Sequence, residues 1–250
     1  MVKKFHWPTT LEIIQKEAGV LEETRKIRKE VAFSMRFQTI YLSHPLASLN
    51  LNLDAAHPPE PPRFVGTVSI LEGRMEAVRF ALDEHKIRGR ASTRTALWTD
   101  ASVKEGKAGI AVVTKTNPAL TNSKWFTQAL SVQCELELSS NIVELLAILK
   151  AVELAEQYFP PRKVIIFSDC QWALYKVKYP KLVVIDCSPE LFRLWNALSE
   201  EIARRSALLK SAGIDLHLHW VPAHSKVPGN YLADHAASRA MRWNGREQSL

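Results

Sequence analysis

Apolar and polar residues alternate with two different periods along this chain, and the change of period marks its regular elements. Three short apolar segments follow Thr95, at residues 96–100, 109–116 and 124–132, and each has the length and composition of a strand. A glycine-containing turn, Lys104–Lys107, separates the first two segments, as in a β-hairpin. The pattern therefore predicts three consecutive antiparallel strands.

Helices alternate with buried strands in the remainder of the chain. Residues 141–158 have the apolar spacing of a helix, and residues 163–169 are a near-continuous apolar run, typical of a strand buried on both faces. A helix from 171, a helix over 189–210, a strand over 215–221 and a helix over 231–242 complete the series. The order β-β-β-α-β-α-α-β-α predicts an α/β fold with a five-stranded mixed sheet flanked by helices.

A different pattern precedes this region. Apolar residues from Leu11 to Ile40 follow helical spacing, and His44-Pro45 ends it because proline interrupts helices. Residues 57–62 are proline-rich, as in a linker. We therefore expect a basic helical N-terminal extension over residues 1–56, a linker and connecting segment over 57–94, a catalytic domain over 95–243 and a tail over 244–250.

The basic residues of the extension have two interpretations. They are Arg25, Lys26, Arg28, Lys29 and Arg36. The simpler interpretation is a solvated helix face, and the alternative is a contact with a nucleic-acid backbone or with a protein partner. The net charge of +7 suits an anionic partner without requiring one.

Composition narrows the class of protein. With 46% hydrophobic and 24% charged residues, the chain has the composition of a globular protein. Its three cysteines form no Cys-x-x-Cys pair, which favours a reduced, intracellular protein in the nucleus or cytoplasm. No apolar run is long enough for a membrane span, and none follows Lys3-Lys4 as in a signal peptide. We therefore expect no membrane association.

Four carboxylates lie at the ends of predicted elements: Asp100 in the first strand, Glu144 in the first long helix, Asp169 after the fourth strand and Asp234 in the last helix. Singly, Asp169 could cap a helix, Asp234 could complement a helix dipole and Glu144 could be a surface residue. Together they would repel one another unless a cation lay between them. Oxygen ligands of this kind select Mg²⁺ or Mn²⁺, and two such ions support phosphodiester hydrolysis.

His224 lies on a predicted loop after the last strand, ten positions before Asp234. A lone histidine is most often a surface or core residue. Here the loop contains Pro228 and Gly229 and is expected at the same edge of the sheet as the carboxylates. That position favours a role in proton transfer and product release.

Four motifs follow one another in order: Thr99-Asp100-Ala101-Ser102 with Gly106 and Gly109, Asn141-x-x-Glu144-Leu145-x-Ala147, Phe167-Ser168-Asp169-Cys170-Gln171, and Trp220-Val221-Pro222-Ala223-His224-x-x-x-Pro228-Gly229-Asn230-x-x-Ala233-Asp234. Together they resemble the ribonuclease H family from Thr95 to near Arg242. The last motif is most similar to the ribonuclease H domains of non-LTR retrotransposon polyproteins. The upstream region resembles, more loosely, the connector that follows reverse transcriptase in such polyproteins.

This resemblance implies a ribonuclease H-like fold and hydrolysis of the RNA strand of RNA·DNA hybrids. Asp100, Glu144, Asp169 and Asp234 would hold two Mg²⁺ ions, which Mn²⁺ can replace, and His224 would assist turnover. The polar residues expected to contact substrate are Ser102, Asn141, Gln171 and Asn230, with helix capping the alternative for Asn141 and Gln171.

Two departures and two other hypotheses accompany this interpretation. Tyr231 stands where many cellular members have glutamate, and Ala223 where glycine is common, which implies a stiffer loop and altered turnover. One alternative is a nucleic-acid-binding scaffold that keeps the fold without cleavage. The other is a different nuclease on the same fold, which the order of the carboxylates and the histidine loop disfavour.

Overall fold

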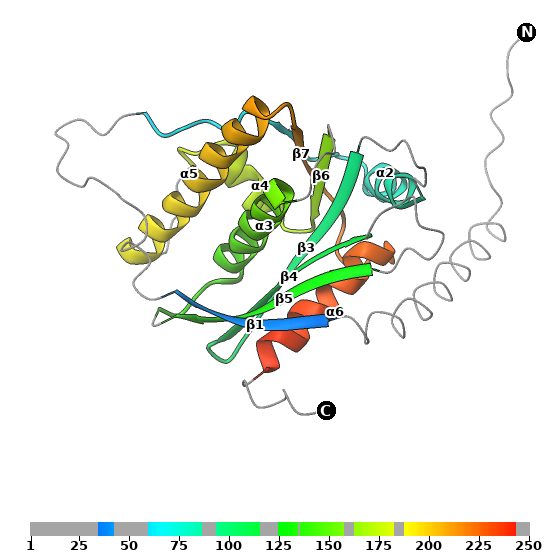
Figure 1. The fold of residues 1–250 in the computed structure, drawn as a ribbon. Helices are drawn as coiled ribbons and strands as arrows, with labels where there is room; N and C mark the ends of the chain where they lie inside the picture. Colours follow the sequence, from blue (N-terminus) through cyan, green and yellow to red (C-terminus); the bar gives the residue numbers. More distant parts are fainter. Residues whose placement is uncertain are drawn as a thin grey trace, which may run out of the picture.

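A computed structural model describes residues 35–42, 60–86, 94–115, 125–134, 136–157, 163–182 and 188–243. The strands are β1 (Met35–Leu42), β2 (Thr67–Ser69), β3 (Arg94–Lys104), β4 (Lys107–Lys115), β5 (Trp125–Cys134), β6 (Lys163–Ser168) and β7 (Asp215–Trp220). The helices are α2 (Arg74–Lys86), α3 (Ser140–Gln157), α4 (Gln171–Lys178), α5 (Pro189–Ser211) and α6 (Pro228–Arg242) (Figure 1). None of the helices in these ranges is long and apolar enough to cross a membrane.

A mixed sheet runs through the middle of the molecule in the order β1-β5-β4-β3-β6-β7-β2 (Figure 1). The hairpin strands β3, β4 and β5 are antiparallel, whereas β6 and β7 continue from β3 in parallel. These are the five predicted strands in the predicted directions, so the α/β class and the mixed sheet are confirmed. The structure adds an edge strand at each side, β1 beside β5 and β2 beside β7.

The N-terminal edge strand corrects one prediction. Helical spacing was expected as far as Ile40, but Met35–Leu42 is extended and pairs in parallel with β5. This segment is rich in aromatic and β-branched residues, which favour strands, and pairing with a sheet edge supplies the hydrogen bonds that a helix would have made internally. The rest of the predicted basic extension lies outside the described residues, so its contacts with nucleic acid or protein, and the proposed domain division, stay predictions.

Helices cover both faces of the sheet. On one face, α3, α4 and α5 bury apolar side chains of β3, β4, β6 and β7 in the larger core cluster. On the other face, α6 packs against β3, β4 and β5. Trp98, Phe167 and Leu232 belong to the core cluster on this side, and Ala81 of α2 is part of the same cluster. The segment predicted as a linker and connector therefore contains β2 and α2, which are part of the folded body.

Two glycines set the distance between helix α6 and the sheet. A Cβ added to Gly109 of β4 would lie 2.3 Å from the amide nitrogen of Met241, and one added to Gly229 would lie 2.1 Å from Cδ2 of Trp98. Only a residue without a side chain permits these approaches. Helix α6 begins at Pro228, three residues before the predicted start, because proline is well suited to the first helical position. The loop that carries His224 is correspondingly shorter.

Candidate active site

Strand register brings Asp100 and Asp169 together. The pairing of β3 with β6 ends at Trp98 and Phe167, and each carboxylate lies two positions beyond this last pair. Because side chains alternate along strands, both carboxylates project from the same face at the same point of the sheet. Asp100 therefore lies inside β3, which continues to Lys104. It lies just beyond the point where β3 stops pairing with β6, and ligands bind at such points in parallel sheets.

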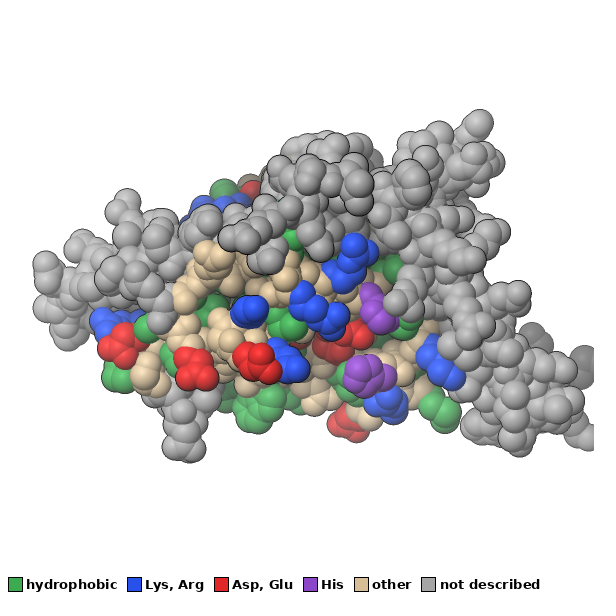
Figure 2. All heavy atoms as spheres, turned by 90° about the horizontal axis from the view of Figure 1, so that it is seen from below, with side chains coloured by type: hydrophobic (Ala, Val, Ile, Leu, Met, Phe, Trp, Pro, Cys, Tyr) green, Lys and Arg blue, Asp and Glu red, His purple; other side chains and the backbone are tan. Residues whose placement is uncertain are grey.

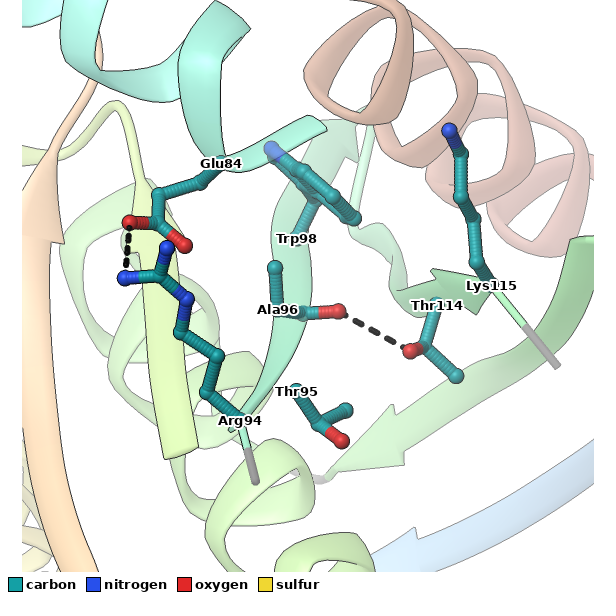
Figure 3. A pocket seen from close by; sticks show the side chains of 7 residues that line it. All are labelled: Glu84, Arg94, Thr95, Ala96, Trp98, Thr114 and Lys115. Atoms are coloured by element: carbon teal, nitrogen blue, oxygen red, sulfur yellow. Dashed lines mark hydrogen bonds and ion pairs between the residues drawn. The ribbon is translucent and has the colours of Figure 1, made fainter. Parts of the chain in front are cut away.

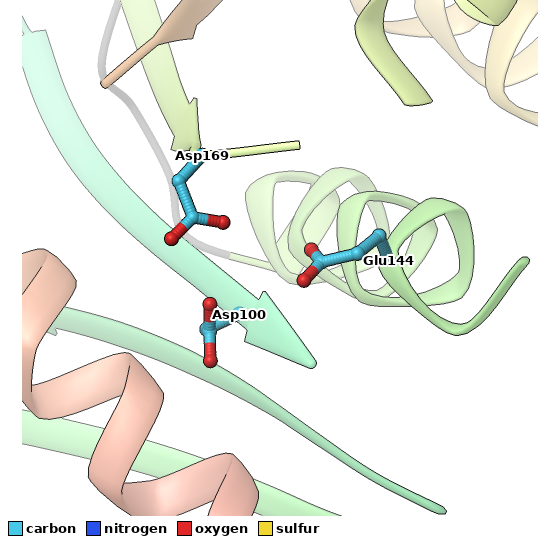
Figure 4. A group of neighbouring side chains, drawn as sticks. All are labelled: Asp100, Glu144 and Asp169. Atoms are coloured by element: carbon cyan, nitrogen blue, oxygen red, sulfur yellow. The ribbon is translucent and has the colours of Figure 1, made fainter. Parts of the chain in front are cut away.

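Helix α3 contributes the third carboxylate. The Glu144 Oε1 atom accepts a hydrogen bond of 3.2 Å from the backbone N–H of Ala101 in β3, which fixes the side chain over that strand. One oxygen from each of Asp100, Glu144 and Asp169 lies within 4.8 Å of the others. Figure 4 shows the three carboxylates directed toward a common point. We call Asp100, Glu144 and Asp169 the carboxylate trio.

The trio is unfavourable without a cation. Burial raises the pKa of Asp100 well above its usual value, and the charges of Glu144, Asp169 and Asp234 raise it further. Burial likewise raises the pKa of Glu144, followed by the charge of Asp169. Burial also raises the pKa of Asp169, against a hydrogen bond from Asn230 and the charge of His224. Ionised together, these groups need positive charge between them.

An unsatisfied atom supports the same conclusion. Oε2 of Glu144 is buried and has no hydrogen-bond partner among the described residues. A buried carboxylate oxygen left unpaired is costly, whereas oxygen ligands clustered within a few ångströms are what hard divalent cations require. The residues present therefore fit a divalent metal ion.

The remaining carboxylate and the histidine lie around this trio. Asp234, half-buried on α6, falls outside the 4.8 Å group, yet its charge raises the pKa of each of the three carboxyls. His224 is exposed on the loop before α6, with a backbone φ of 53°. Trp220, at the end of β7, pairs with Ser168, so the loop that carries His224 starts at the same edge of the sheet as Asp169. The charge of His224 lowers the pKa of Asp169.

Two of the four predicted substrate contacts are engaged within the protein. Asn230 is 3% exposed, and its Nδ2 donates to Oδ2 of Asp169 at 3.5 Å. The hydroxyl of Ser102 donates to Sδ of Met241 at 3.4 Å and accepts from Ser238. Asn230 stands four positions before Asp234, so its place on the same helix face could have been read from the sequence.

The other two flank the trio at helix starts. Oδ1 of Asn141, near the start of α3, accepts a hydrogen bond of 3.5 Å from Sγ of Cys170. Gln171 is the first residue of α4 and is half-exposed. Trp220 also orients the site, since its Nε1 donates to the carbonyl of Asp169 at 3.1 Å. Nothing in the motif pattern distinguished that tryptophan from a core residue.

Burial also acts on the nearby thiol of Cys170. Burial raises the pKa of Cys170 to about 12, with the charge of Glu144 as the next cause. Since the thiolate is the nucleophilic form, a thiol with this raised pKa is a poor candidate for a nucleophile.

The family model for RNase H matches residues 92–242, more than half of the chain. This chain belongs to the RNase H family. Among solved structures, RNase H1 from the archaeon Halobacterium salinarum is similar at 17% identity over 60% of this chain and 98% of its own, with a TM-score of 0.42. An N-terminal RNase H domain from Mycobacterium tuberculosis is similar at 17% identity over 60% of this chain and 94% of its own (TM-score 0.39).

The RNase H domain of PFV, a foamy virus, is also similar, at 17% identity over 59% of this chain and 94% of its own, with a TM-score of 0.42. A comparison with curated proteins finds no match. The family assignment therefore depends on the match over residues 92–242, which contains all three members of the carboxylate trio.

Proposed function

We propose that this protein is a divalent-cation-dependent endonuclease that hydrolyses the RNA strand of RNA·DNA hybrids, with Mg²⁺ as the cation. The observation that carries the proposal is the carboxylate trio in a member of the RNase H family. Two of its residues are buried and one is half-buried, and one oxygen from each lies within 4.8 Å of the others. Asp100, Glu144 and Asp169, with Asp234 beside them, would hold the cations. Bound divalent cations supply charge stabilisation and an activated water for phosphodiester hydrolysis.

The protein's own groups would hold these ligands in place. The Ala101 N–H orients Glu144, and Asn230 and Trp220 orient Asp169 through its side chain and its carbonyl. We assign to His224 the proton transfer to the leaving 3′-oxygen, because its ring is exposed and its charge acts on Asp169. The products would be a 3′-hydroxyl and a 5′-phosphate.

Selection of RNA over DNA requires contact with the 2′-hydroxyl. Of the four residues predicted for that role, Gln171 and Asn141 are the better candidates, since they stand beside the trio at the starts of α4 and α3. The amide of Asn230 and the hydroxyl of Ser102 already have partners in the protein. The origin of the chain in a retrotransposon polyprotein stays a prediction from the motifs.

Charge on the molecular surface gives a further constraint. Figure 2 shows lysine and arginine side chains interspersed with acidic ones on the described part of one face, with histidines among them. A mixed surface of this kind offers less non-specific attraction to phosphate than a continuous basic face. The described part of this face is therefore a poor candidate for strong non-specific binding of phosphate.

The proposal is tested with labelled RNA·DNA, RNA·RNA and DNA·DNA duplexes, each with Mg²⁺ or with EDTA. We expect Mg²⁺-dependent loss of the RNA strand of the hybrid alone, and no cleavage by Asp169→Asn. Asp83→Asn is the matched control, because Asp83 is an exposed residue of α2. Binding of the hybrid without cleavage would refute the nuclease and favour a scaffold role.

A further inference from the structure

Helix α2 is attached to the catalytic fold although it precedes the residues that the family model matches. It spans Arg74–Lys86, whereas the match begins at residue 92. Ala77 and Ala81 are fully buried, and the ring of Phe80 stacks on His219 of β7 with 4.4 Å between centroids. The middle of α2 is thus fixed against the central strands by apolar contact.

The C-terminal end of α2 is held by two polar contacts with β3 and β4. Glu84, whose side chain is 7% exposed, pairs with Arg94 at 3.1 Å, and Nζ of Lys115 donates to the carbonyl of His85 at 2.7 Å. Figure 3 shows the Glu84–Arg94 pair beside Trp98 at the pocket under this end of the helix. Strand β3 also carries Asp100, so α2 has a defined position relative to the carboxylate trio.

The N-terminal end of α2 reaches the loop that carries His224. Nη2 of Arg74 donates to the backbone carbonyl of Ala223 at 3.0 Å, across a sequence separation of 149 residues. Ala223 immediately precedes His224. Ala223 belongs to the loop of residues 222–227, which we call the His224 loop. Through this one bond, the helix that packs on β3 also contacts that loop.

The His224 loop needs such support. Val221, just before the loop, and Val227, its last residue, are fully buried, whereas Ala223 and His224 are exposed. His224 and Lys226 have φ angles of 53° and 59°, in the left-handed region that side chains disfavour. Residues in this conformation persist only where surrounding contacts hold them.

We propose that Arg74 is a positioning residue that fixes the His224 loop, and that α2 transmits the position of β3 to that loop. The effect on catalysis rests on the role proposed above for His224. The hydrogen bond itself concerns only the protein. An alternative role for the same guanidinium, direct contact with a substrate phosphate, is an outcome of the test below.

The kinetic test uses the full chain with Arg74→Met, Arg74→Lys and the matched control Arg79→Met, which alters another exposed arginine of α2. Loss of one hydrogen bond should lower kcat for hybrid cleavage by about two- to tenfold, with KM nearly unchanged. Arg74→Lys should recover part of this loss, because it retains a cationic donor. In a His224→Ala background, Arg74→Met should lower kcat no further.

A structural measurement keeps the two proposals separate. Hydrogen exchange at the amides of residues 223–226 should be faster in Arg74→Met than in the wild type, and unchanged in Arg79→Met. Unchanged exchange in Arg74→Met would overturn the positioning role. So would a rise in KM with a weaker salt dependence, which indicates phosphate contact, or an equal loss of kcat in the His224→Ala background. If the wild type cleaves no duplex, the proposed function fails, and exchange alone decides the positioning role.

Discussion

The carboxylate trio makes an unusual prediction about stability: replacing Asp100 by asparagine should stabilise the protein when divalent cations are absent. Asparagine has nearly the shape of aspartate and can still form a hydrogen bond with Asp169, but it carries no charge. Asp100 is 5% exposed, and its carboxyl lies beside Glu144 and Asp169. The substitution therefore removes a buried charge and its repulsion without opening a cavity.

The structure sets the magnitude. Two charges 4.8 Å apart at an effective dielectric constant of about 20 repel by roughly 3.5 kcal/mol. The full repulsion is not realised, because burial and the neighbouring charges raise the pKa of Asp100 and the group takes up a proton instead. We expect the free energy of unfolding to rise by about 1–3 kcal/mol, which corresponds to roughly 2–12 °C in Tm.

The dependence on pH has a defined sign. The pKa of Asp100 is higher in the folded state than in the unfolded state, so the folded state binds more protons at intermediate pH. Wild-type stability therefore decreases as the pH rises from the unfolded pKa of about 4 through the raised folded pKa. The advantage of Asp100→Asn should be small near pH 4 and should grow toward pH 8.

Urea unfolding in EDTA at pH 5 and pH 8, followed by tryptophan fluorescence, measures this advantage. Asp83→Asn is the control, since the side chain of Asp83 is 64% exposed and its pair with Lys86 is a surface contact. Added Mg²⁺ should stabilise the wild type more than Asp100→Asn. It should support cleavage by the wild type only. If Asp100→Asn is less stable in EDTA and Mg²⁺ does not shift the wild type, Asp100 is structural and the metal site is refuted.

Three further predictions concern packing and pH. Gly229→Ala should lower the free energy of unfolding by about 1–3 kcal/mol and reduce cleavage, because the new methyl group overlaps the indole ring of Trp98. The control is Gly73→Ala, which should change neither quantity because a Cβ there has no neighbour nearer than 3.5 Å. Lys176→Met should lower the free energy of unfolding, measured in urea, by about 2–4 kcal/mol, because a fully buried ammonium that donates three hydrogen bonds is lost. Lys178→Met, at an exposed position, should lower it little. Burial lowers the pKa of His219 to about 4, so acid should remove about 1–2 kcal/mol between pH 6.5 and 4, after allowance for solvent screening of a half-exposed ring. His219→Phe should abolish that part of the acid sensitivity, and an unchanged pH profile would contradict it.

Much of the site follows from local pattern. The apolar runs of β3 and β6 and the alternation of side chains predict that Asp100 and Asp169 meet at one edge of the sheet, and the register confirms it. Glu144 was predictable because an acidic residue on the apolar stripe of α3 is conspicuous. These features depend on periods of two and about 3.6 residues, which short segments of sequence encode.

Other features depend on contacts between distant segments. The strand β1 is extended because β5 offers an edge, although its residues continue a helical spacing. The hydrogen bond from Asn230 to Asp169 spans 61 residues, so the Asn230 amide contacts a carboxylate of the trio where the motif had led us to expect a contact with substrate. The spacing of residues within a short segment does not encode contacts of this kind, and the order of the motifs does not predict them either.

The His224 loop combines both cases. Its motif identifies the histidine, and Gly229 identifies where α6 must approach Trp98. Yet two residues of the loop have strained φ angles, and such angles require support from surrounding contacts. Arg74 provides this support, although it belongs to none of the motifs and precedes the residues that the family model matches. Arg74→Met keeps every carboxylate of the trio and loses this support. Its stabilisation by Mg²⁺ should therefore equal that of the wild type while its rate of cleavage falls, and an equal loss of both would contradict the positioning role.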